Sequence, residues 1–253
     1  MSKKHAFIPD TQLREGVPVE HIAAAGNYIA EKQPDVIVVI GDWWDLPSLS
    51  SYDKAGSLGW EDKDLMSDIE FGCDMMADFL SPIEAVNGYS PQLVFCMGNH
   101  EDRLRRAREH PEFRRVRRYL SDDLFRLRHF GFRVIPFQAV VKIDGILYSH
   151  YFVNPRSLMK RPMGGSITNR LDKLGHSFSM GHQQTHEVGA IYTATGERRR
   201  GLVSGAFYAH DEDYIGPQGN AQYWRGMVMK HEVRRGDYDL MEVSLDYLNE
   251  NYQ

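Results

Sequence analysis

The chain has 253 residues and a formal net charge of −5, and 42% of its residues are hydrophobic, which is typical of a globular protein with a sizeable core. The overall negative charge argues against a polycation that coats nucleic acid. Two cysteines are too few for a disulfide framework or a zinc ribbon, and the sequence contains neither a signal-peptide core nor an apolar run of transmembrane length. We therefore expect a single domain over residues 1–253, without membrane segments and located in the cytoplasm.

The first half of the chain alternates strand-like and helix-like segments. Short apolar runs rich in β-branched residues are typical of buried strands, and the stretches between them have helical spacing of apolar residues. The expected strands are 5–9, 36–40 and 93–97, and the expected helices are 19–33 and 62–85. This alternation predicts an α/β layer structure, in which ligands bind at the carboxyl ends of the strands.

The second half is richer in strands. The expected strands are 132–142, 145–151, 177–181, 188–194, 201–206 and 225–233, with turns at Asp144-Gly145 and Thr195-Gly196. Two sheets packed face to face, with helices outside, would accommodate both halves of the chain.

Five short polar clusters each follow an apolar run at the end of an expected strand. They are Pro9-Asp10-Thr11-Gln12, Gly41-Asp42-Trp43-Trp44-Asp45, Gly98-Asn99-His100-Glu101-Asp102, Ser149-His150 and Gly181-His182-Gln183-Gln184. Carboxylates, imidazoles and amide oxygens are ligands that suit Mn²⁺, Fe or Zn²⁺. Each cluster alone is better explained as a helix cap, a core histidine or a turn. Their joint occurrence at strand ends indicates a metal site.

These clusters resemble the motifs of the calcineurin-like metallophosphoesterase superfamily, which are D-x-H, GD-x-x-D, GNH-[DE], a lone His and GH-x-H. The resemblance spans roughly residues 5–186, and GDWWD and GNHED are its most specific parts. The opening D-x-Q is similar to a phage-type branch. The resemblance implies a four-layer α/β/β/α sandwich and hydrolysis of a phosphoric ester by a water activated at two divalent ions. Mn²⁺ is the favoured ion, with Fe, Zn²⁺, Ni²⁺ and Mg²⁺ as alternatives.

The resemblance also implies the metal ligands. They are Asn99, His150 and His182 for one ion, Asp10, Gln12 and Gln184 for the other, and Asp42 between the two. Gln12 and Gln184 depart from the family pattern, which has histidines at both places. Because an amide oxygen is a weaker ligand than an imidazole nitrogen, we expect the position beside Asp10 to bind its ion less tightly, to prefer a harder ion or to fill only when substrate arrives. His186 is an alternative ligand there.

His100 and Asp45 are the catalytic residues that the resemblance implies. His100 would protonate the leaving oxygen or donate to the phosphate, and Asp45 would fix its tautomer. Eight arginines lie between residues 103 and 118. They either recognise a phosphate-rich substrate such as nucleic acid or form a solvated helix face, and Arg103, the nearest to the motif, is the candidate substrate-binding residue.

Three further segments have open interpretations. Trp43-Trp44 is interpreted as core, with stacking on a base or aryl group as the alternative. Residues 154–175 form either a lid or a surface excursion with a short helix at 166–174. Residues 210–214 contain additional acidic and imidazole side chains in a loop that is close enough in sequence to the last strands to approach the site.

The sequence therefore favours an enzyme that hydrolyses a phosphodiester or nucleic acid. A small-molecule phosphomonoesterase is one alternative. The other is a non-catalytic module that binds phosphorylated partners, which Gln12 and Gln184 motivate. Retention of His100 and Asp45 argues against that module, since a protein that only binds needs neither.

Overall fold

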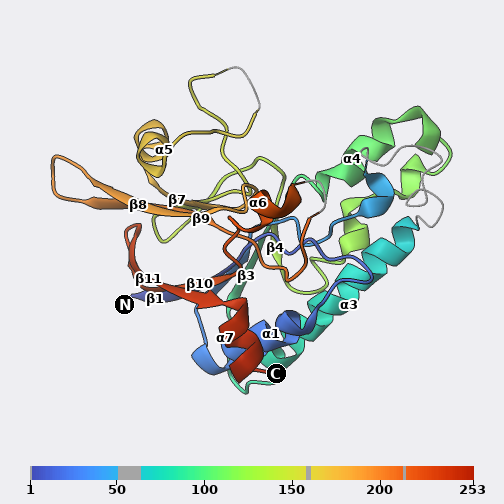
Figure 1. Cartoon of the computed structure of the whole chain (residues 1–253), viewed down its shortest axis with the longest axis horizontal. Coiled ribbons are helices and arrows are strands. Elements are labelled where there is room, and N and C mark those ends of the chain that lie inside the picture. Colours follow the sequence, from blue (N-terminus) through green and yellow to red (C-terminus); the bar gives the residue numbers. More distant parts are fainter. Residues whose placement is uncertain (1, 51–63, 158–160, 213–214) are drawn as a thin grey trace.

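The computed structural model of the protein describes residues 2–50, 64–157, 161–212 and 215–253. Two β-sheets lie one on the other, with α1, α3 and α7 against the outer face of one sheet and α5 against the outer face of the other (Figure 1). This arrangement confirms the predicted α/β/β/α sandwich.

The first sheet has six strands in the described part of the chain, in the order β11-β10-β1-β2-β3-β4. Their bounds are β1 (Lys3–Ile8), β2 (Val36–Val39), β3 (Gln92–Cys96), β4 (Arg133–Ile135), β10 (Gly226–Arg234) and β11 (Asp237–Ser244). The strands β1 to β4 run parallel, and β10 and β11 add an antiparallel edge. Their parallel direction brings the ends of β1, β2 and β3 to one edge of the sheet.

The second sheet has five strands within the described ranges, in the order β5-β6-β7-β9-β8. They are β5 (Val141–Ile143), β6 (Ile146–Tyr148), β7 (Ser177–Met180), β8 (His186–Tyr192) and β9 (Arg198–Ser204). The central strands β6, β7 and β9 are parallel. The predicted tight turns fall between β5 and β6 and between β8 and β9, as expected.

Three apolar layers hold the sandwich together. The helices α1 (Glu20–Lys32), α3 (Leu65–Glu84) and α7 (Leu245–Asn251) cover one face of the first sheet, and a second layer lies between the sheets. The third lies beneath α5 (Ile167–Leu174). Alternate residues of β1 serve different layers: Ile8 faces the helices and Phe7 faces the second sheet. Burial on both faces explains why β2 and the second half of β1 are apolar.

Shorter helices surround the edge where the parallel strands end. They are α4 (Asp102–Glu109), α6 (Gly216–Asn220) and the 3₁₀ turns η1 (Pro47–Leu49), η2 (Pro111–Phe113), η3 (Arg117–Tyr119) and η4 (Asp122–Phe125). Within the described residues, none of the helices has the length and apolar character needed to cross a membrane.

One predicted strand is wrong, and two elements of the fold were not predicted. Residues 132–142 form two strands in different sheets, because Pro136 lacks a backbone N–H and Gln138 adopts a positive φ of 64°, both of which interrupt a strand. The strand β11 and the helix α7 were not expected. The strand lies at a sheet edge with mixed burial, so its sequence lacks the apolar run of a central strand. The expected helix 62–85 begins at Leu65, and residues 62–63 lie outside the described residues.

Candidate metal centre

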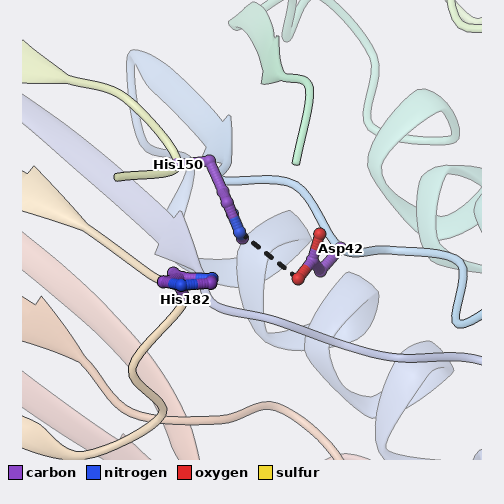
Figure 2. A group of neighbouring side chains, drawn as sticks. All are labelled: Asp42, His150 and His182. Carbon is purple, nitrogen blue, oxygen red and sulfur yellow. Dashed lines mark ion pairs between the residues drawn. The ribbon is translucent and has the colours of Figure 1, made fainter. Parts of the chain in front are cut away.

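The predicted site residues meet where the parallel strands of both sheets end. Asp10, Asp42 and Asn99 each follow β1, β2 or β3 within three residues, and these strands are parallel neighbours. His150 and His182 follow the parallel neighbours β6 and β7 in the same way. Because the sheets are stacked, side chains from both reach one point, and Figure 2 shows His150 and His182 beside Asp42.

One group of side chains has the spacing of a metal site. Asp42, His150 and His182 each offer a ligand atom, and these atoms lie within 4.8 Å of one another. His150 Nε2 is 3.3 Å from Asp42 Oδ2 and 2.9 Å from Asn99 Oδ1. Ligands that sit about 2 Å from a shared ion lie about 3–4 Å from each other, so this group, with Asn99 beside His150, is a candidate to bind a divalent cation. We call this group the Asp42 position.

Hydrogen bonding and charge prepare His150 for this role. Its Nδ1 donates to the Ile40 carbonyl at 2.9 Å, which turns Nε2 toward Asp42 and Asn99. Histidines that ligate metals are commonly held by such a hydrogen bond from the other ring nitrogen. Burial lowers the pKa of His150, but the Asp42 carboxylate outweighs it and raises that pKa to about 9. Without a metal, a proton on Nε2 therefore occupies the place that a cation would take.

Asp42 and His182 have complementary electrostatics. Burial raises the pKa of Asp42, but His150 and His100 outweigh it and hold the pKa well below its usual range. Burial and the positive charge of His150 lower the pKa of His182 to about 4. Near neutral pH the carboxylate is therefore charged and the second imidazole is neutral, which are the forms that bind metal.

Glycines allow the carboxylates to approach the backbone. A Cβ on Gly98 would lie 2.2 Å from Asp42 Oδ1, and a Cβ on Gly181 would lie 2.1 Å from Asp10 Oδ1. Both distances are shorter than any real contact, so neither place tolerates a side chain. The glycines of GNH and GHQ are explained by this close approach.

Four site residues also have a backbone conformation that side chains disfavour. The φ angles are 45° at Gln12, 50° at Asp42, 68° at His182 and 59° at Gln184. Each such residue costs about 1–3 kcal/mol unless its surroundings enforce the conformation, and such residues cluster at functional sites. The disfavoured φ angles of these four residues therefore indicate that the direction of their side chains is important at the strand ends.

The residues predicted for the second ion form what we call the Asp10 position. Asp10 is buried, and its carboxylate accepts from the His182 N–H at 3.0 and 2.9 Å. Burial raises the pKa of Asp10 to about 7, although the charge of His150 opposes the rise. Gln12 is buried beside it, and its N–H donates to the Asp42 carbonyl at 2.8 Å. The structure thus brings the Asp10 position next to the Asp42 position.

Gln184 has a protein partner of its own. Its Oε1 accepts from the Tyr208 hydroxyl at 2.7 Å, in a buried contact. The alternative ligand, His186, points elsewhere: its Nε2 is 2.8 Å from Glu242 Oε1, and its ring packs 4.4 Å from that of Trp224. The alternative in which His186 replaces Gln184 is not supported, because Glu242 and Trp224 engage the His186 imidazole.

His100 lies beside the metal ligands in a defined orientation. Its Nδ1 is 2.9 Å from the Asp45 carbonyl and 3.1 Å from Asp45 Oδ1, so Nδ1 carries the proton and Nε2 faces Asp42 Oδ2 at 3.8 Å. Burial lowers the pKa of His100, but Asp42 and Asp45 outweigh it and keep that pKa above its usual value. The Asp45 side chain thus has the contact with His100 that was predicted for the carboxylate that fixes its tautomer.

Arg103 has different surroundings from those expected of a substrate ligand. Its Nη1 donates to the carbonyls of Asp45 at 2.6 Å and Leu46 at 3.2 Å, and its Nη2 lies 3.1 Å from His100 Nε2. Only 13% of its side chain is exposed. The guanidinium therefore ties His100 to the loop after β2, and substrate binding by Arg103 stays a prediction.

Glu101 has a structural role that sequence reasoning missed. Its buried carboxylate accepts from the N–H groups of Gly98, Asp42 and Trp43 at 2.7, 2.9 and 2.8 Å, and from Trp44 at 3.3 Å. It thereby clamps the loop after β2 to the loop after β3. The glutamate of GNHED was the available signal, but the motif alone does not say that its partners are backbone groups.

A chain of charged groups connects His100 to a distant segment of sequence. Arg14 Nη1 lies 2.7 Å from Asp45 Oδ2 and 3.2 Å from Glu212 Oε1, and Glu212 Oε1 lies 2.9 Å from His210 Nε2. Sequence reasoning placed residues 210–214 near the site without roles, and Arg14 was missed. Residues 213–214 lie outside the described residues.

Two further segments had open interpretations. Trp43 and Trp44 are fully buried, and their Nε1 atoms donate to the carbonyls of Gly72 and Ile69, so both belong to the core. The segment 154–175 contains the helix α5, capped by the Ser166 side chain, where a short helix was expected, and a role as a lid stays a prediction. Residues 158–160 lie outside the described residues.

Comparison with known proteins adds little to this picture. No family model matches the sequence, and no curated protein sequence matches it. A solved structure, described only as a crystal structure, aligns over 96% of this chain and 100% of its own chain, with 12% identity and a TM-score of 0.47. A likeness at this level carries no statement about function, so the function has to be inferred from the site itself.

Proposed function

We propose that this protein is a metal-dependent phosphoesterase that hydrolyses a phosphoric ester, with a phosphodiester favoured and Mn²⁺ as the favoured ion. One observation carries the proposal. Ligand atoms from both sheets converge at the Asp42 position, and a histidine held by a carboxylate stands directly beside them. A metal site that only stabilised the fold would not need His100 with its proton-bearing Nδ1 fixed by Asp45.

The side chains have separable roles in this reaction. Divalent ions held at the two positions would supply charge stabilisation for the phosphate oxygens and a water of lowered pKa. Asp42 would be a ligand of both ions, and its low pKa keeps it ionised. His100, with Nδ1–H held by Asp45, presents Nε2 to the site and delivers a proton from that atom to the leaving oxygen.

The preference for a diester rests on the exposed arginines that follow the site, since several phosphates would satisfy them better than one. The rival function is a non-catalytic module that binds phosphorylated partners. The contact of Gln184 with Tyr208 favours that module, because it engages a side chain predicted to bind the second ion. The His100–Asp45 pair favours the enzyme.

A paired assay separates the two functions. Wild-type protein is stripped with EDTA, reloaded with Mn²⁺ and tested on bis-p-nitrophenyl phosphate and p-nitrophenyl phosphate, beside Asp42→Ala. Asp239→Asn, whose side chain is 74% exposed, is the matched control. We expect Mn²⁺-dependent turnover, higher on the diester, that is lost in Asp42→Ala and kept in the control. Absence of metal-dependent turnover on both esters would leave the binding module as the better proposal.

A further inference from the structure

The segment that follows the site has a charge opposite to that of the whole protein. Residues 103–133 contain eleven arginines against four carboxylates, whereas the chain as a whole has a net charge of −5. Such an asymmetry is the electrostatic pattern of a surface that meets polyanions. A solvated helix face is the competing explanation, and the partners of each arginine decide between the two.

Two exposed arginines of α4 have carboxylate partners. Arg105 pairs with Asp102 and Glu109 at 2.7 and 3.0 Å, and the Nε of Arg106 lies 3.6 Å from Asp102 Oδ2. These side chains therefore fit the solvated-face explanation. The helix ends at Glu109, before Pro111, so the arginines beyond it do not belong to the same face.

The next arginines have no such partners. Arg114, Arg115 and Arg117 are exposed, and among the described side chains no carboxylate lies within ion-pair distance of them. Arg118 lies with its Cζ 4.6 Å above the ring of Tyr119, whose side chain is 60% exposed. We call this group, Arg114, Arg115, Arg117, Arg118 and Tyr119, the arginine face.

Unpaired cations beside an exposed aromatic ring match one polyanion best. Single-stranded nucleic acid offers phosphates to the guanidinium groups and unpaired bases that stack on an aromatic side chain. A duplex keeps its bases stacked internally and cannot use Tyr119 in this way. A membrane surface usually requires a longer amphipathic helix with a broad apolar face, whereas η3 spans only Arg117–Tyr119.

The arginine face also lies at a suitable distance from the metal centre. The helix α4 begins directly after Asn99 and His100 and packs against η3, so it separates the two places (Figure 1). Its eight residues span about 12 Å at 1.5 Å per residue. A single strand of several nucleotides can extend over that length. A small ester bound at the metals is too short to reach the arginine face.

We propose that the arginine face binds single-stranded nucleic acid whose phosphodiester backbone continues into the metal centre. The inference rests on the proposed phosphoesterase function and adds the substrate class. It also predicts a division of labour. Removing the face weakens binding of an oligonucleotide and leaves hydrolysis of a small diester unchanged.

The first test measures binding alone. A labelled twelve-residue oligothymidylate is titrated in EDTA, where hydrolysis does not proceed, with fluorescence anisotropy as the readout. The test variant carries Arg115→Gln and Arg117→Gln. The control carries Arg234→Gln and Arg235→Gln, two exposed arginines at the hairpin between β10 and β11, at the opposite end of β1 from the site.

We expect the test variant to bind about tenfold more weakly, and the slope of log affinity against log salt to fall by about 1.4, because two phosphate contacts are lost. Tyr119→Ala should weaken binding about tenfold with little change in the slope. The control should bind like the wild type. Equal losses in test and control variants, or tighter binding of a duplex or of phosphatidylserine vesicles than of the single strand, would overturn the proposal.

The second test measures turnover of the same variants with Mn²⁺. We expect unchanged kcat/KM on bis-p-nitrophenyl phosphate and a higher KM on the oligonucleotide for the test variant. An equal loss of kcat/KM on both substrates would contradict the proposal that the arginine face serves only the oligonucleotide. If wild-type protein binds the oligonucleotide in EDTA but hydrolyses neither substrate, the phosphoesterase proposal fails while the binding face stands, so the two failures are distinguishable.

Discussion

The Asp42 position and the Asp10 position both lie at the ends of parallel strands. Their side chains differ in their hydrogen-bond partners. At the Asp42 position, the polar atoms of His150, Asn99 and Asp42 face one another. At the Asp10 position, the carboxylate accepts from a backbone N–H and the amide oxygen of Gln184 accepts from Tyr208. The amide oxygen of Gln184 thus already has a protein partner, whereas the ligand atoms of the Asp42 position face one another.

The largest effect should come from removing a ligand of the Asp42 position. We expect His150→Ala to lower Mn²⁺-dependent kcat/KM on bis-p-nitrophenyl phosphate by about a thousandfold, since a buried imidazole and its place beside Asp42 are both lost. The matched change at the other position, Gln184→Ala, should lower it about tenfold or less. Equal losses in the two variants would remove the difference between the positions.

A smaller effect should come from the residue that handles the proton. His100→Ala should lower kcat about a hundredfold on an oligonucleotide, whose leaving oxygen needs a proton. The loss on bis-p-nitrophenyl phosphate should be much smaller, because p-nitrophenolate leaves without one. Calorimetric titration with Mn²⁺ should give unchanged affinity for the Asp42 position. An equal fall in kcat on both esters would show that His100 supports metal binding rather than protonation of the leaving oxygen.

The two positions should also respond differently to pH. Mn²⁺ must displace the proton of His150, whose pKa is about 9, so affinity at the Asp42 position should rise about tenfold per pH unit up to that pH. At the Asp10 position the rise should stop near pH 7, where the Asp10 carboxyl loses its proton. Calorimetric titrations at pH 6, 7, 8 and 9 measure the Mn²⁺ affinity of both positions. The same dependence of affinity on pH for the two ions would contradict the assignment of His150 to one ion and Asp10 to the other.

The smallest effect should come from the charged chain behind Asp45. Arg14→Ala removes the group that joins Asp45 to Glu212, and we expect kcat to fall about tenfold with KM and Mn²⁺ affinity unchanged. Arg14→Lys should restore part of the rate, because one ammonium spans the two carboxylates less well than a guanidinium. Arg198→Ala, which breaks a similar pair with Asp237, is the control. A fall in thermal stability without a fall in kcat would indicate a structural role alone.

Much of this architecture was predictable from local sequence. Central strands such as β2 are apolar on both faces, and the polar residues after them had to lie at one edge of a parallel sheet. The ligand-type residues of the Asp42 position followed from that placement together with the family motifs. The strand β11 was not predictable, because an edge strand with exposed side chains has a mixed pattern.

Contacts between residues far apart in sequence were the other feature that could not be predicted. The contact of Tyr208 with Gln184 and the pairing of Arg14 with Glu212 join residues that no spacing rule connects. Arg103 was assigned to substrate because it is near the motif in sequence, whereas in the fold its guanidinium contacts the loop after β2. The sequence therefore indicated which residue types gather at the site. The fold shows which of these side chains form hydrogen bonds or ion pairs with other protein groups.

The most direct test counts bound manganese and measures turnover in the same samples. Metal-free protein is titrated with Mn²⁺, free ion is followed by electron paramagnetic resonance, and bis-p-nitrophenyl phosphate hydrolysis is assayed at each point. We predict one tightly bound ion, a second that binds at least about tenfold more weakly, and turnover that rises as the second ion binds. Two ions of equal affinity, or saturation with both ions without turnover, would contradict the proposed asymmetric phosphoesterase site.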